Sequence, residues 1–223
     1  MTEHAFDIVV LGGGSGGYAA ALRAAELGKT VALIEKDKVG GTCLHRGCIP
    51  TKALLHAAEV ADAARESARF GVTATLEGID PLALRAYREG IVAKKFKGLE
   101  GLVKARGITV VPGSGRLDAD RGIVVGDDVY RGADVILATG SYSRSLPGLE
   151  IGGRILTSEQ ALALDEVPAR VVILGGGVIG VEFASVWRSF GAEVTIVEAL
   201  EHLVPNEDLA VRDRKSTRLN SSH

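Results

Sequence analysis

The amino-acid sequence predicts an α/β fold made of two tandem βαβ units, of which the second is incomplete. Residues 6–35 hold a short β-branched run, a glycine-rich turn, an Ala-rich segment and a second apolar run. The same succession recurs over residues 170–198. Each unit has about the 30-residue length of a parallel crossover. An internal repeat of this kind indicates two related domains in one chain.

Composition narrows the class of protein. The chain has 223 residues, which suits one full domain and part of another, and 46% are hydrophobic while 24% are charged. The net charge of -2 comes without a basic patch, so nucleic acid and membrane surfaces are not expected partners. No apolar run approaches the ~20 residues that span a bilayer, and no signal-type stretch opens the chain. We therefore expect a cytoplasmic protein.

The first unit is predicted from residue patterns in chain order. The apolar run Phe6–Leu11 indicates a strand, and Tyr18–Leu27 has helical character. Gly28 follows that helix as its expected C-terminal cap. Thr30–Glu35 then indicates a second strand, so the unit closes as β-α-β.

Two long helices and several short strands are expected next. The Ala-rich segment Cys48–Phe70 predicts a helix, with Pro50 in the first turn, where proline is tolerated. Pro81–Arg106 predicts another. Turn residues separate the short strands expected after it, which are Ile108–Val111, Gly115–Asp118, Gly122–Val125, Val129–Arg131 and Ala133–Ala138.

The second unit follows an irregular stretch, Ser141–Pro168, whose Pro147-Gly148 pair marks a domain boundary. We predict a first domain over residues 1–148 and the start of a second over residues 149–212. The elements expected in the second unit are a strand over Arg170–Leu174, a helix over Val181–Phe190 and a strand over Glu193–Glu198.

The last residues differ in character from the rest. Asp213–His223 is polar and interrupts a segment that reads as the start of a helix. It resembles the translation of a sequencing-library adapter in one reading frame. We therefore expect residues 213–223 to be a non-native tail, to be left out of fold reasoning.

A glycine fingerprint lies between the first strand and helix. Gly12 would permit the tight turn, Gly14 the approach of the backbone to a pyrophosphate, and Gly17 the close packing of helix and strand. The helix N-terminus then offers N–H groups to phosphates. Glu35, at the end of the second strand, can accept hydrogen bonds from ribose hydroxyls. Strand, helix and acidic residue together favour a Rossmann-like dinucleotide site over a structural turn.

The second unit repeats every part of that pattern. Gly175, Gly177 and Gly180 stand at the fingerprint positions, and Glu198 ends the following strand. A carboxylate there favours the free 2′-hydroxyl of NAD and repels the 2′-phosphate of NADP. We therefore expect NAD rather than NADP at this fingerprint.

Two cysteines stand five residues apart at the predicted start of a helix. On a regular helix Cys43 and Cys48 would point roughly 140° apart, because each residue turns ~100°. They can meet only if Cys43 lies in the loop before the helix, and Gly47 supplies the freedom for a distorted first turn. Cys48 then begins the helix, where the dipole favours negative charge. This arrangement suits a pair that cycles between disulfide and dithiol.

Two other readings of the cysteines stay open at this point. A metal site could recruit His45 or His56, although zinc sites usually show two closely spaced ligand pairs and only one pair is present here. Inert buried cysteines are the other alternative. Metal binding is the less expected reading, and we predict no metal ligands.

The run from Gly40 to Glu59, GGTCLHRGCIPTKALLHAAE, is similar to the redox-active segment of dihydrolipoamide dehydrogenases, the E3 components of 2-oxo acid dehydrogenase complexes. The opening fingerprint, the Ala138–Ser141 segment and GGGVIGVEFASVW match that family in order and spacing. The resemblance covers residues 5–212. It is highly specific for the glutathione-reductase-like flavoproteins and less so for the lipoamide branch. Arg46 departs from the family, which often has asparagine or another small polar residue there.

The resemblance implies FAD on the first fingerprint and NAD on the second. The residues that would contact FAD are Gly12, Gly14, Ser15, Gly16, Gly17, Glu35, Lys36, Gly41, Thr42, Lys52, Ser114, Gly115, Ala138, Thr139, Gly140 and Ser141. Those that would contact NAD are Gly175, Gly177, Val178, Ile179, Gly180 and Glu198.

The resemblance also implies roles in catalysis. Cys43 and Cys48 would form the redox-active disulfide, with Cys43 exchanging with dihydrolipoamide and Cys48 lying next to the flavin. Lys52 and Glu182 match a lysine–glutamate pair beside the flavin N5 edge; from the residues alone both would read as surface charges. The implied partners are dihydrolipoamide on the lipoyl domain of a 2-oxo acid dehydrogenase complex and a second copy of the chain in a homodimer.

The family's histidine base, which acts across the dimer from a C-terminal domain, has no match in this chain. We therefore expect the chain as written to be inactive by itself. Mercuric, mycothiol-disulfide or glutathione-type reductases remain alternatives within the enzyme class. A non-catalytic flavin-binding fragment is the alternative of a different class.

Overall fold

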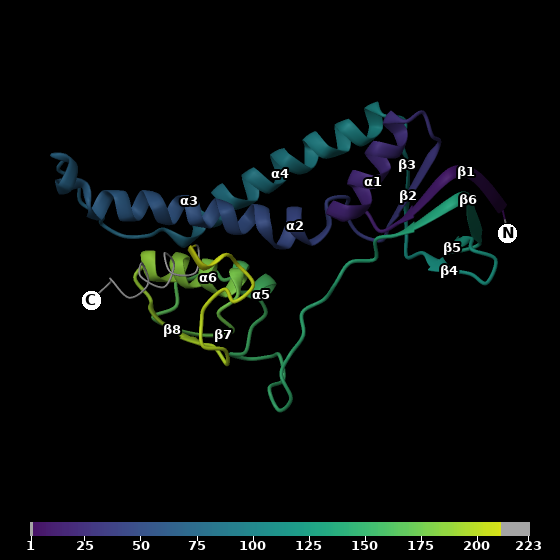
Figure 1. The fold of residues 1–223 in the computed structure, drawn as a ribbon. Coiled ribbons are helices and arrows are strands. Elements are labelled where there is room, and N and C mark those ends of the chain that lie inside the picture. Colours follow the sequence, from purple (N-terminus) through teal and green to yellow (C-terminus); the bar gives the residue numbers. More distant parts are fainter. Residues whose placement is uncertain (1, 211–223) are drawn as a thin grey trace. The chain divides into compact units, whose positions relative to one another are not determined.

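The computed structural model describes residues 2–210, which divide into two compact units (Figure 1). Unit 1 comprises residues 2–50 and 90–157, and unit 2 comprises residues 51–89 and 158–210. The tail predicted over residues 213–223 lies outside the described residues. These two units are defined by contacts between residues and not by nucleotide binding. The functional division at residue 148 therefore stays a prediction.

Unit 1 is built on a mixed sheet, which places it in the predicted α/β class. Within the described residues the strand order is β3-β2-β1-β6-β5-β4. Four neighbouring strands are parallel, and β5 and β4 add an antiparallel edge. The strands are β1 (Thr2–Leu11), β2 (Val31–Glu35), β3 (Thr109–Pro112), β4 (Arg116–Leu117), β5 (Ile123–Val125) and β6 (Asp128–Leu137).

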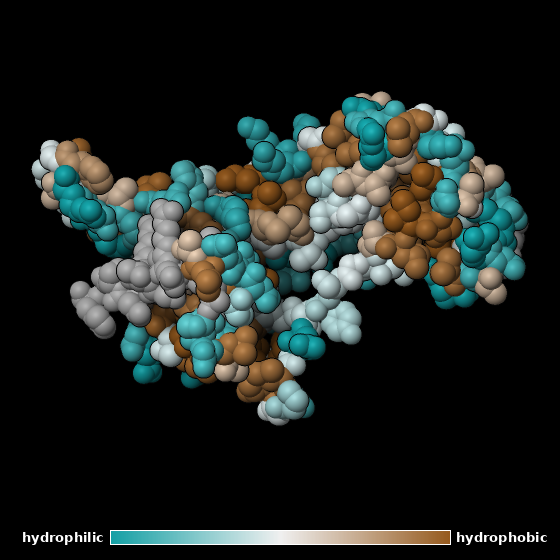
Figure 2. Space-filling model, in the orientation of Figure 1, coloured by the Kyte–Doolittle hydropathy of each residue, from teal (hydrophilic) through white to brown (hydrophobic). Residues whose placement is uncertain are grey.

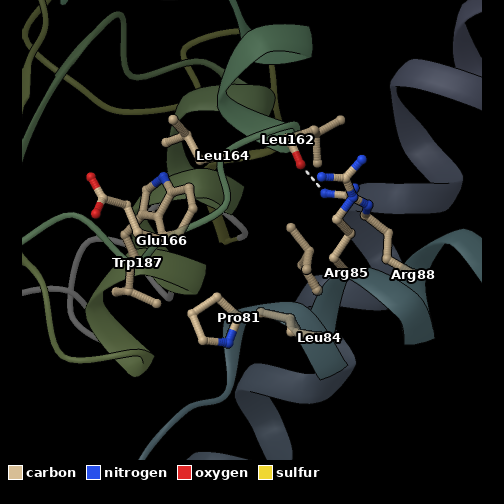
Figure 3. A pocket seen from close by; sticks show the side chains of 10 residues that line it. Pro81, Leu84, Arg85, Arg88, Leu162, Leu164, Glu166 and Trp187 are labelled. Atoms are coloured by element: carbon tan, nitrogen blue, oxygen red, sulfur yellow. Dashed lines mark hydrogen bonds between the residues drawn. The ribbon is translucent and has the colours of Figure 1, made fainter.

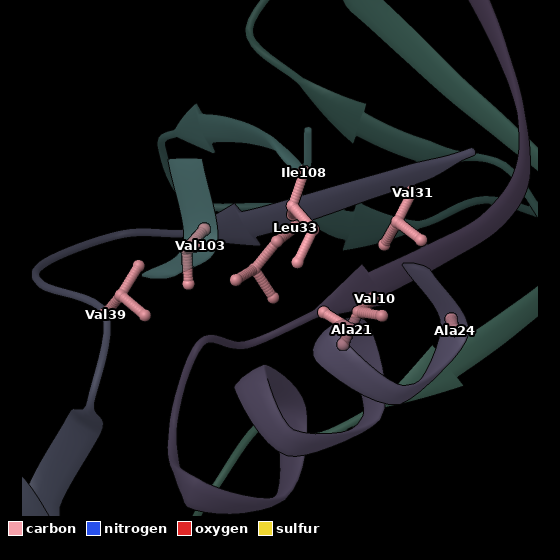
Figure 4. Packing of buried hydrophobic residues seen from close by; sticks show 8 residues of the cluster. All are labelled: Val10, Ala21, Ala24, Val31, Leu33, Val39, Val103 and Ile108. Carbon is pink, nitrogen blue, oxygen red and sulfur yellow. The ribbon is translucent and has the colours of Figure 1, made fainter. Parts of the chain in front are cut away.

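The apolar parts of strands β1 and β2 have side chains buried on both faces of the sheet. In β1, Val10 packs into a cluster beneath helix α1 (Ser15–Glu26), whereas Val9 packs on the opposite face. In β2, Leu33 packs into the same cluster as Val10, and Ile34 packs with Val9 on the opposite face. Figure 4 shows the first cluster between sheet and helix. This continuous burial is typical of parallel strands and explains why the two runs lack alternation.

Helix α1 ends as the sequence predicts. Gly28 has φ +75°, and its N–H donates to the carbonyl of Ala25 at 3.0 Å. The N–H of Lys29 donates to Ala24 at 3.1 Å. These bonds satisfy carbonyls that the last helical turn leaves open, with glycine in the left-handed conformation that it adopts most readily.

The start of α1 approaches the end of β1 very closely. Gly12 has φ +103°, and a Cβ atom there would lie 2.1 Å from the carbonyl oxygen of Ala138. A Cβ at Gly17 would lie 1.8 Å from the carbonyl oxygen of Gly12. The roles predicted for Gly12 in the turn and Gly17 in helix–strand packing are therefore those that the backbone requires.

Two expected elements differ from the structure. The strands predicted over Val129–Arg131 and Ala133–Ala138 are a single strand, β6, because Gly132 lets β6 lie close to β1: a Cβ there would be 2.9 Å from the nitrogen of Val9. The helix predicted to reach Phe70 ends earlier. Helix α3 (Cys48–Arg65) is followed by a 3-10 turn, η1 (Ser67–Phe70).

Unit 2 holds the second βαβ unit. Its parallel strands β7 (Arg170–Leu174) and β8 (Glu193–Val197) flank helix α6 (Val178–Ser189) in sequence. Leu54 and Ala58 of α3 pack with Phe183, Val186 and Trp187 of α6 in one buried cluster. The remaining helices are α5 (Ser158–Leu162), inside the stretch predicted to be irregular, and α4 (Pro81–Ala105), whose residues 81–89 belong to unit 2.

Unit 2 also contains a small apolar pocket between α4, α5 and α6 (Figure 3). Arg88, which is buried, lies at its edge and donates to the carbonyl of Leu162. Trp187 and Leu84 supply apolar walls, and none of the predicted cofactor residues lines this pocket.

Surface hydropathy varies within unit 1. Figure 2 shows hydrophobic residues gathered over β1 and β6 of the sheet. Leu137, near the end of β6, is 57% exposed. Within residues 2–210, no helix combines the length and apolar character needed to cross a membrane.

The bonds that join β1 to the start of β2 generate a pH-dependent prediction. Thr30 donates to the Asp7 carboxylate from both its backbone N–H and its hydroxyl, each at 2.7 Å. The backbone bond and then the hydroxyl bond lower the pKa of Asp7 below its usual 3.8. Because the folded-state pKa is depressed, this stabilisation is present above pH 3.8 and is lost as the pH falls through the folded-state value.

We expect Asp7→Asn to lower the urea midpoint of unfolding modestly at pH 7, and the difference from wild type to shrink below pH 3.8. Asp134→Asn is the matched control, because Asp134 is exposed on neighbouring β6. A difference at pH 7 that persists unchanged at pH 3 would contradict the assignment.

The close approach of α1 predicts a contrast between adjacent glycines. Gly17→Ala places a methyl group against the Gly12 carbonyl and should cost about 3 kcal/mol, near the upper end for overpacking. Gly16→Ala is the control, because a Cβ at this helical position meets no described atom within 4 Å. Alanine should stabilise that site by about 0.5–1 kcal/mol. Denaturant unfolding measures both, and equal effects would refute the packing argument.

Candidate functional site

The first glycine fingerprint lies at the start of helix α1. Gly14 is the N-cap of α1, no side chain in the described residues caps it, and the first turn holds no acidic residue. A Cβ at Gly14 would meet no described atom within 4 Å, so the loop is open on that side. Helix N–H groups, the dipole and this open space suit a phosphate group. The residues present therefore fit a dinucleotide pyrophosphate.

The four loops that carry the predicted FAD residues leave the same edge of the sheet. They follow the carboxyl ends of β1, β2, β3 and β6, where α/β sheets bind ligands. Backbone bonds tie these loops together. The N–H of Gly12 donates to Ile34 at 2.8 Å, that of Ala138 to Leu11 at 2.8 Å, and that of Gly113 to Glu35 at 2.9 Å.

The remaining predicted residues at this edge divide into exposed and packed positions. Gly115 is required by packing, since a Cβ there would lie 2.6 Å from Cδ1 of Leu11. Gly140 has φ +82°. The exposed residues are Ser15, Gly16, Lys36, Thr42, Ser114, Thr139, Gly140 and Ser141.

The segment that carries the cysteines lies directly on this fingerprint loop. The N–H of Gly40 donates to the carbonyl of Gly13 at 2.8 Å. A Cβ at Gly41 would lie 2.6 Å from the Cα of Gly14. Gly40 and Gly41 both have positive φ, +111° and +57°. Only glycine permits this approach, so the backbone itself places the cysteine segment against the phosphate loop.

Cys43 lies in a short helix, α2 (Gly41–Arg46), and not in the loop that the sequence predicted. The pair of glycines at 40 and 41 starts this helix early. Gly47 then leaves the helical conformation, with φ -142° and ψ -108°. Cys48 begins α3 immediately afterwards. The break at Gly47 therefore replaces the predicted distorted first turn, and the ~140° divergence of a regular helix does not apply.

The side chain of Cys43 is half-buried and that of Cys48 is exposed. Leu44, between them, is buried. A Cβ at Gly40 would collide with this leucine side chain at 2.3 Å. The exposed thiol thus stands at a helix start on a well-anchored segment.

The polar neighbours of the cysteines have local partners. The ring nitrogen Nε2 of His45 lies 3.0 Å from the carbonyl oxygen of Val39, and the ring meets Phe96 edge-on at 5.0 Å. Arg46 forms an ion pair with Asp37, in the loop after β2. This pair gives a structural reason for arginine where the resembling family often has asparagine.

The metal alternative named His45 and His56 as further ligands beside the cysteines. Within residues 2–210, no group of three or more His, Cys, Asp and Glu side chains is arranged to hold a metal ion. His56, the second histidine considered, lies 3.3 Å from a carboxylate oxygen of Glu59 on the same helix.

Lys52 and Glu182 meet in unit 2. The ammonium of Lys52 donates to Oε1 of Glu182 at 2.6 Å, across 130 residues of sequence. The Lys52 side chain is 57% exposed, whereas that of Glu182 is 16% exposed. A half-exposed ion pair contributes little stability, so its value lies in holding the ammonium at a defined place. The structure brings together two residues that the sequence alone would leave on the surface.

The second fingerprint repeats the geometry of the first. Gly175 has φ +100°, and a Cβ at Gly180 would lie 2.0 Å from the carbonyl oxygen of Gly175. Gly177 is the N-cap of α6, and the first turn of that helix contains no acidic residue. A Cβ at Gly177 meets no described atom within 4 Å. This loop therefore also fits a dinucleotide. Val178 and Ile179, the other predicted NAD contacts, are exposed in that first turn.

In each unit, the glutamate that follows the fingerprint accepts a hydrogen bond from the middle glycine of the fingerprint. Glu35 Oε2 accepts the N–H of Gly13 at 2.6 Å, and Glu198 Oε2 accepts that of Gly176 at 2.6 Å. The pKa of Glu198 is lowered, first by the N–H of Leu200 and then by that of Gly176. Sequence reasoning missed the two middle glycines, although the run of three glycines in each repeat was the available signal.

A family model described as pyridine nucleotide-disulphide oxidoreductase matches residues 6–222. Among curated relatives, dihydrolipoyl dehydrogenase of Bacillus subtilis is 43% identical over 220 residues, covering 92% of this chain and 46% of the relative. The mitochondrial dihydrolipoyl dehydrogenase of Pisum sativum is 42% identical, covering 92% and 43%. Leghemoglobin reductase of Vigna unguiculata is 41% identical, covering 92% and 41%. The chain thus spans about half the length of these relatives.

Solved structures agree with this assignment. A Cu(II) complex of the HOCl-induced flavoprotein disulfide reductase RclA from Escherichia coli has a TM-score of 0.78 and 30% identity, covering 96% of this chain and 46% of that one. A further structure of that reductase has a TM-score of 0.76, covering 96% and 47%. Sequence, fold and the two fingerprints flanking a cysteine pair lead to one conclusion: the chain belongs to the pyridine nucleotide-disulphide oxidoreductase family.

Proposed function

We propose that the protein to which this chain belongs is a flavoprotein that oxidises dihydrolipoamide to lipoamide with NAD⁺. The observation that carries this proposal is the contact of the cysteine segment with the first fingerprint loop through Gly40 and Gly41. A thiol pair attached to a dinucleotide-binding loop is suited to exchanging electrons with the bound cofactor. The relatives named dihydrolipoyl dehydrogenase, at 40–43% identity, support the choice of substrate.

The first fingerprint would hold FAD and the second would hold NAD. In unit 1, the α1 N-terminus would face the pyrophosphate, and Glu35 would accept a hydrogen bond from a ribose hydroxyl. In unit 2, the α6 N-terminus and Glu198 would do the same for NAD. Bound FAD would supply the two-electron chemistry that links a dithiol to a nicotinamide.

The two cysteines would carry out thiol–disulfide exchange with the substrate. In the oxidised pair, a dihydrolipoamide thiolate attacks the sulfur of Cys43, the Cys43–Cys48 bond breaks, and Cys48 leaves as a thiolate. The second substrate thiolate then attacks the mixed disulfide, which forms the cyclic lipoamide disulfide and releases Cys43 as a thiolate. The substrate loses two electrons and two protons, and the cysteine pair holds the two electrons.

Lys52 and Glu182 would act as a positioning pair for charge beside the flavin. Lys52 lies one helical turn after Cys48 on α3, and Glu182 holds its ammonium at 2.6 Å. A fixed positive charge stabilises negative charge that develops on a nearby group.

The wider setting is also proposed from the relatives. A dihydrolipoamide dehydrogenase would receive its substrate on the lipoyl domain of a 2-oxo acid dehydrogenase complex, act as a homodimer, and work in the cytoplasm of a bacterial cell. The bacterial origin of relatives such as that of Bacillus subtilis supports the compartment.

Substrate identity is tested with the complete gene product. We expect NAD⁺-linked oxidation of dihydrolipoamide, with much lower activity toward glutathione disulfide, mycothiol disulfide or mercuric ion using NADH or NADPH. Initial rates of NADH formation or consumption distinguish these reactions. A preference for any of the other three substrates would replace the lipoamide proposal with the corresponding reductase.

The cysteine roles predict different results for two single variants of that protein. Cys43→Ser and Cys48→Ser should each lower dihydrolipoamide turnover by about three orders of magnitude, because each removes an exchanging sulfur. Cys43→Ser should keep a long-wavelength absorption from the thiolate beside the flavin, whereas Cys48→Ser should lose it. The reverse spectral pattern would exchange the two roles.

The 223-residue chain gives a separate test, because it spans 46% of the length of the Bacillus subtilis relative. We expect the purified chain to retain little FAD and to show no dihydrolipoamide turnover. Absorption near the flavin band and an NAD⁺-linked assay measure both properties. A yellow chain that oxidises dihydrolipoamide would show that it contains a complete active site.

A further inference from the structure

The carboxylate that ends the second strand of each βαβ unit joins two loops. In unit 2 the N–H of Gly176 donates to Oε2 of Glu198 at 2.6 Å, while the N–H of Leu200 donates to Oε1 at 2.9 Å. We call these two bonds the carboxylate bridge. They connect the fingerprint loop before α6 with the loop after β8, and each carboxylate oxygen accepts one backbone N–H.

The first βαβ unit contains the same bridge. Glu35 Oε2 accepts the N–H of Gly13 at 2.6 Å, and Glu35 Oε1 accepts the N–H of Asp37 at 2.9 Å. In both units 22 residues separate the glycine from the carboxylate. The recurrence of the same atoms at the same distances in two separate units shows that the bridge belongs to the fingerprint itself.

The bridged glycine is held on its other side as well. The carbonyl of Gly176 accepts the N–H of Val204 at 2.8 Å, as that of Gly13 accepts the N–H of Gly40. A Cβ at Gly176 would lie 2.3 Å from Leu203 and 3.3 Å from Oε2 of Glu198. The middle glycine therefore leaves no room for a side chain between loop and carboxylate.

We propose that Glu198 is a positioning residue for the phosphate-binding loop of the second fingerprint, in addition to contacting the nucleotide ribose. The bridge holds Gly176, and with it the loop that presents the N-terminus of α6 to a pyrophosphate. This inference rests on the proposed binding of a dinucleotide at that fingerprint. The remaining lone pairs of the carboxylate stay available to a ribose hydroxyl.

The positioning role and simple electrostatics predict opposite changes in nucleotide affinity when the Glu198 carboxylate is removed. Removing a carboxylate near a diphosphate relieves repulsion and should tighten binding of the anion. Losing the bridge leaves the loop less ordered and should weaken binding. Hydrogen bonds to a charged acceptor are stronger than neutral ones, so the loss of order should dominate.

The test compares ADP with 2′,3′-dideoxy-ADP, which lacks both hydroxyls of the ribose ring, by calorimetric titration of the complete gene product loaded with FAD, in which the first fingerprint is occupied. Glu198→Ala should weaken binding of both ligands by roughly fivefold or more. Glu198→Gln, which keeps one acceptor oxygen, should give a smaller loss for both. Glu201→Ala, an equal charge change at an exposed residue nearby, is the control and should leave both affinities unchanged. Unchanged or tighter binding of dideoxy-ADP by Glu198→Ala would overturn the proposal.

Amide hydrogen exchange of the nucleotide-free chain supplies a second readout. Exchange at both Gly176 and Leu200 should become faster in Glu198→Ala, exchange at one or both of these amides should become faster in Glu198→Gln, and both should stay unchanged in Glu201→Ala. If the alanine variant does not fold, the glutamine variant carries both measurements. Wild-type exchange rates in the glutamine variant would refute the bridge. A wild-type chain with slow exchange at both amides but no ADP binding would instead remove the proposed nucleotide site, and the positioning role with it.

Discussion

The contact between two glycine-rich backbones is the constraint on which the candidate site depends. Gly40 donates to Gly13, and Gly41 approaches the Cα of Gly14 so closely that no side chain fits between them. Because both segments are backbone at the contact, their separation is set by a backbone hydrogen bond and van der Waals contact and not by a flexible side chain. The short helix α2 begins at this contact and carries Cys43 within its first turn. The loop suited to a pyrophosphate and the sulfur suited to exchange are therefore held as one rigid piece.

A comparison of the two βαβ units separates the features that belong to the glycine fingerprint from those that position the cysteine segment. Both have a positive φ at the first glycine, an uncapped helix start and a carboxylate bonded to the middle glycine. They differ in the segment after the second strand. In unit 1 the carbonyl of Gly13 accepts a bond from Gly40, which begins the cysteine segment, whereas in unit 2 the carbonyl of Gly176 accepts from Val204. The two units thus share the geometry of the fingerprint and differ in the segment that donates to the middle glycine.

The sequence predicts those parts of the fold that local chemistry determines. The strands before the two fingerprints, the Gly28 cap and the two long helices follow from apolar runs, glycine positions and helix formers. Parts that depend on tertiary packing do not follow. Gly132 marks a turn in a sequence pattern, but in the folded chain it lets β6 lie against β1. The helix around Cys43 forms where Gly40 and Gly41 pack against the fingerprint loop, which is distant from them in sequence.

The same distinction applies to the site. The spacing of the fingerprint glycines indicates their structural roles, so the roles of Gly12 in the turn and Gly17 in helix–strand packing could be predicted from the sequence alone. The pairing of Lys52 with Glu182 spans 130 residues and could not be inferred from spacing; only the family resemblance pointed to it. Arg46 is a further case, because its partner Asp37 lies in a loop whose path depends on the bonds of Glu35.

Helix α6 organises unit 2, because its buried side chains pack against both helix α3 and the strands β7 and β8. Two parallel strands alone make a marginal sheet, and Val172, Leu174 and Val197 remain 66%, 53% and 51% exposed on one face of it. The buried side chains of α6 lie between α3 and the other face of the strands: Leu54 and Trp187 share a cluster, and Val171, Ile173 and Val194 pack against it. Apolar burial on this scale outweighs a half-exposed ion pair by several-fold in free energy. The packing of α3 on α6 therefore holds the second fingerprint from its helix side, and the Lys52–Glu182 pair is placed by that packing and does not create it.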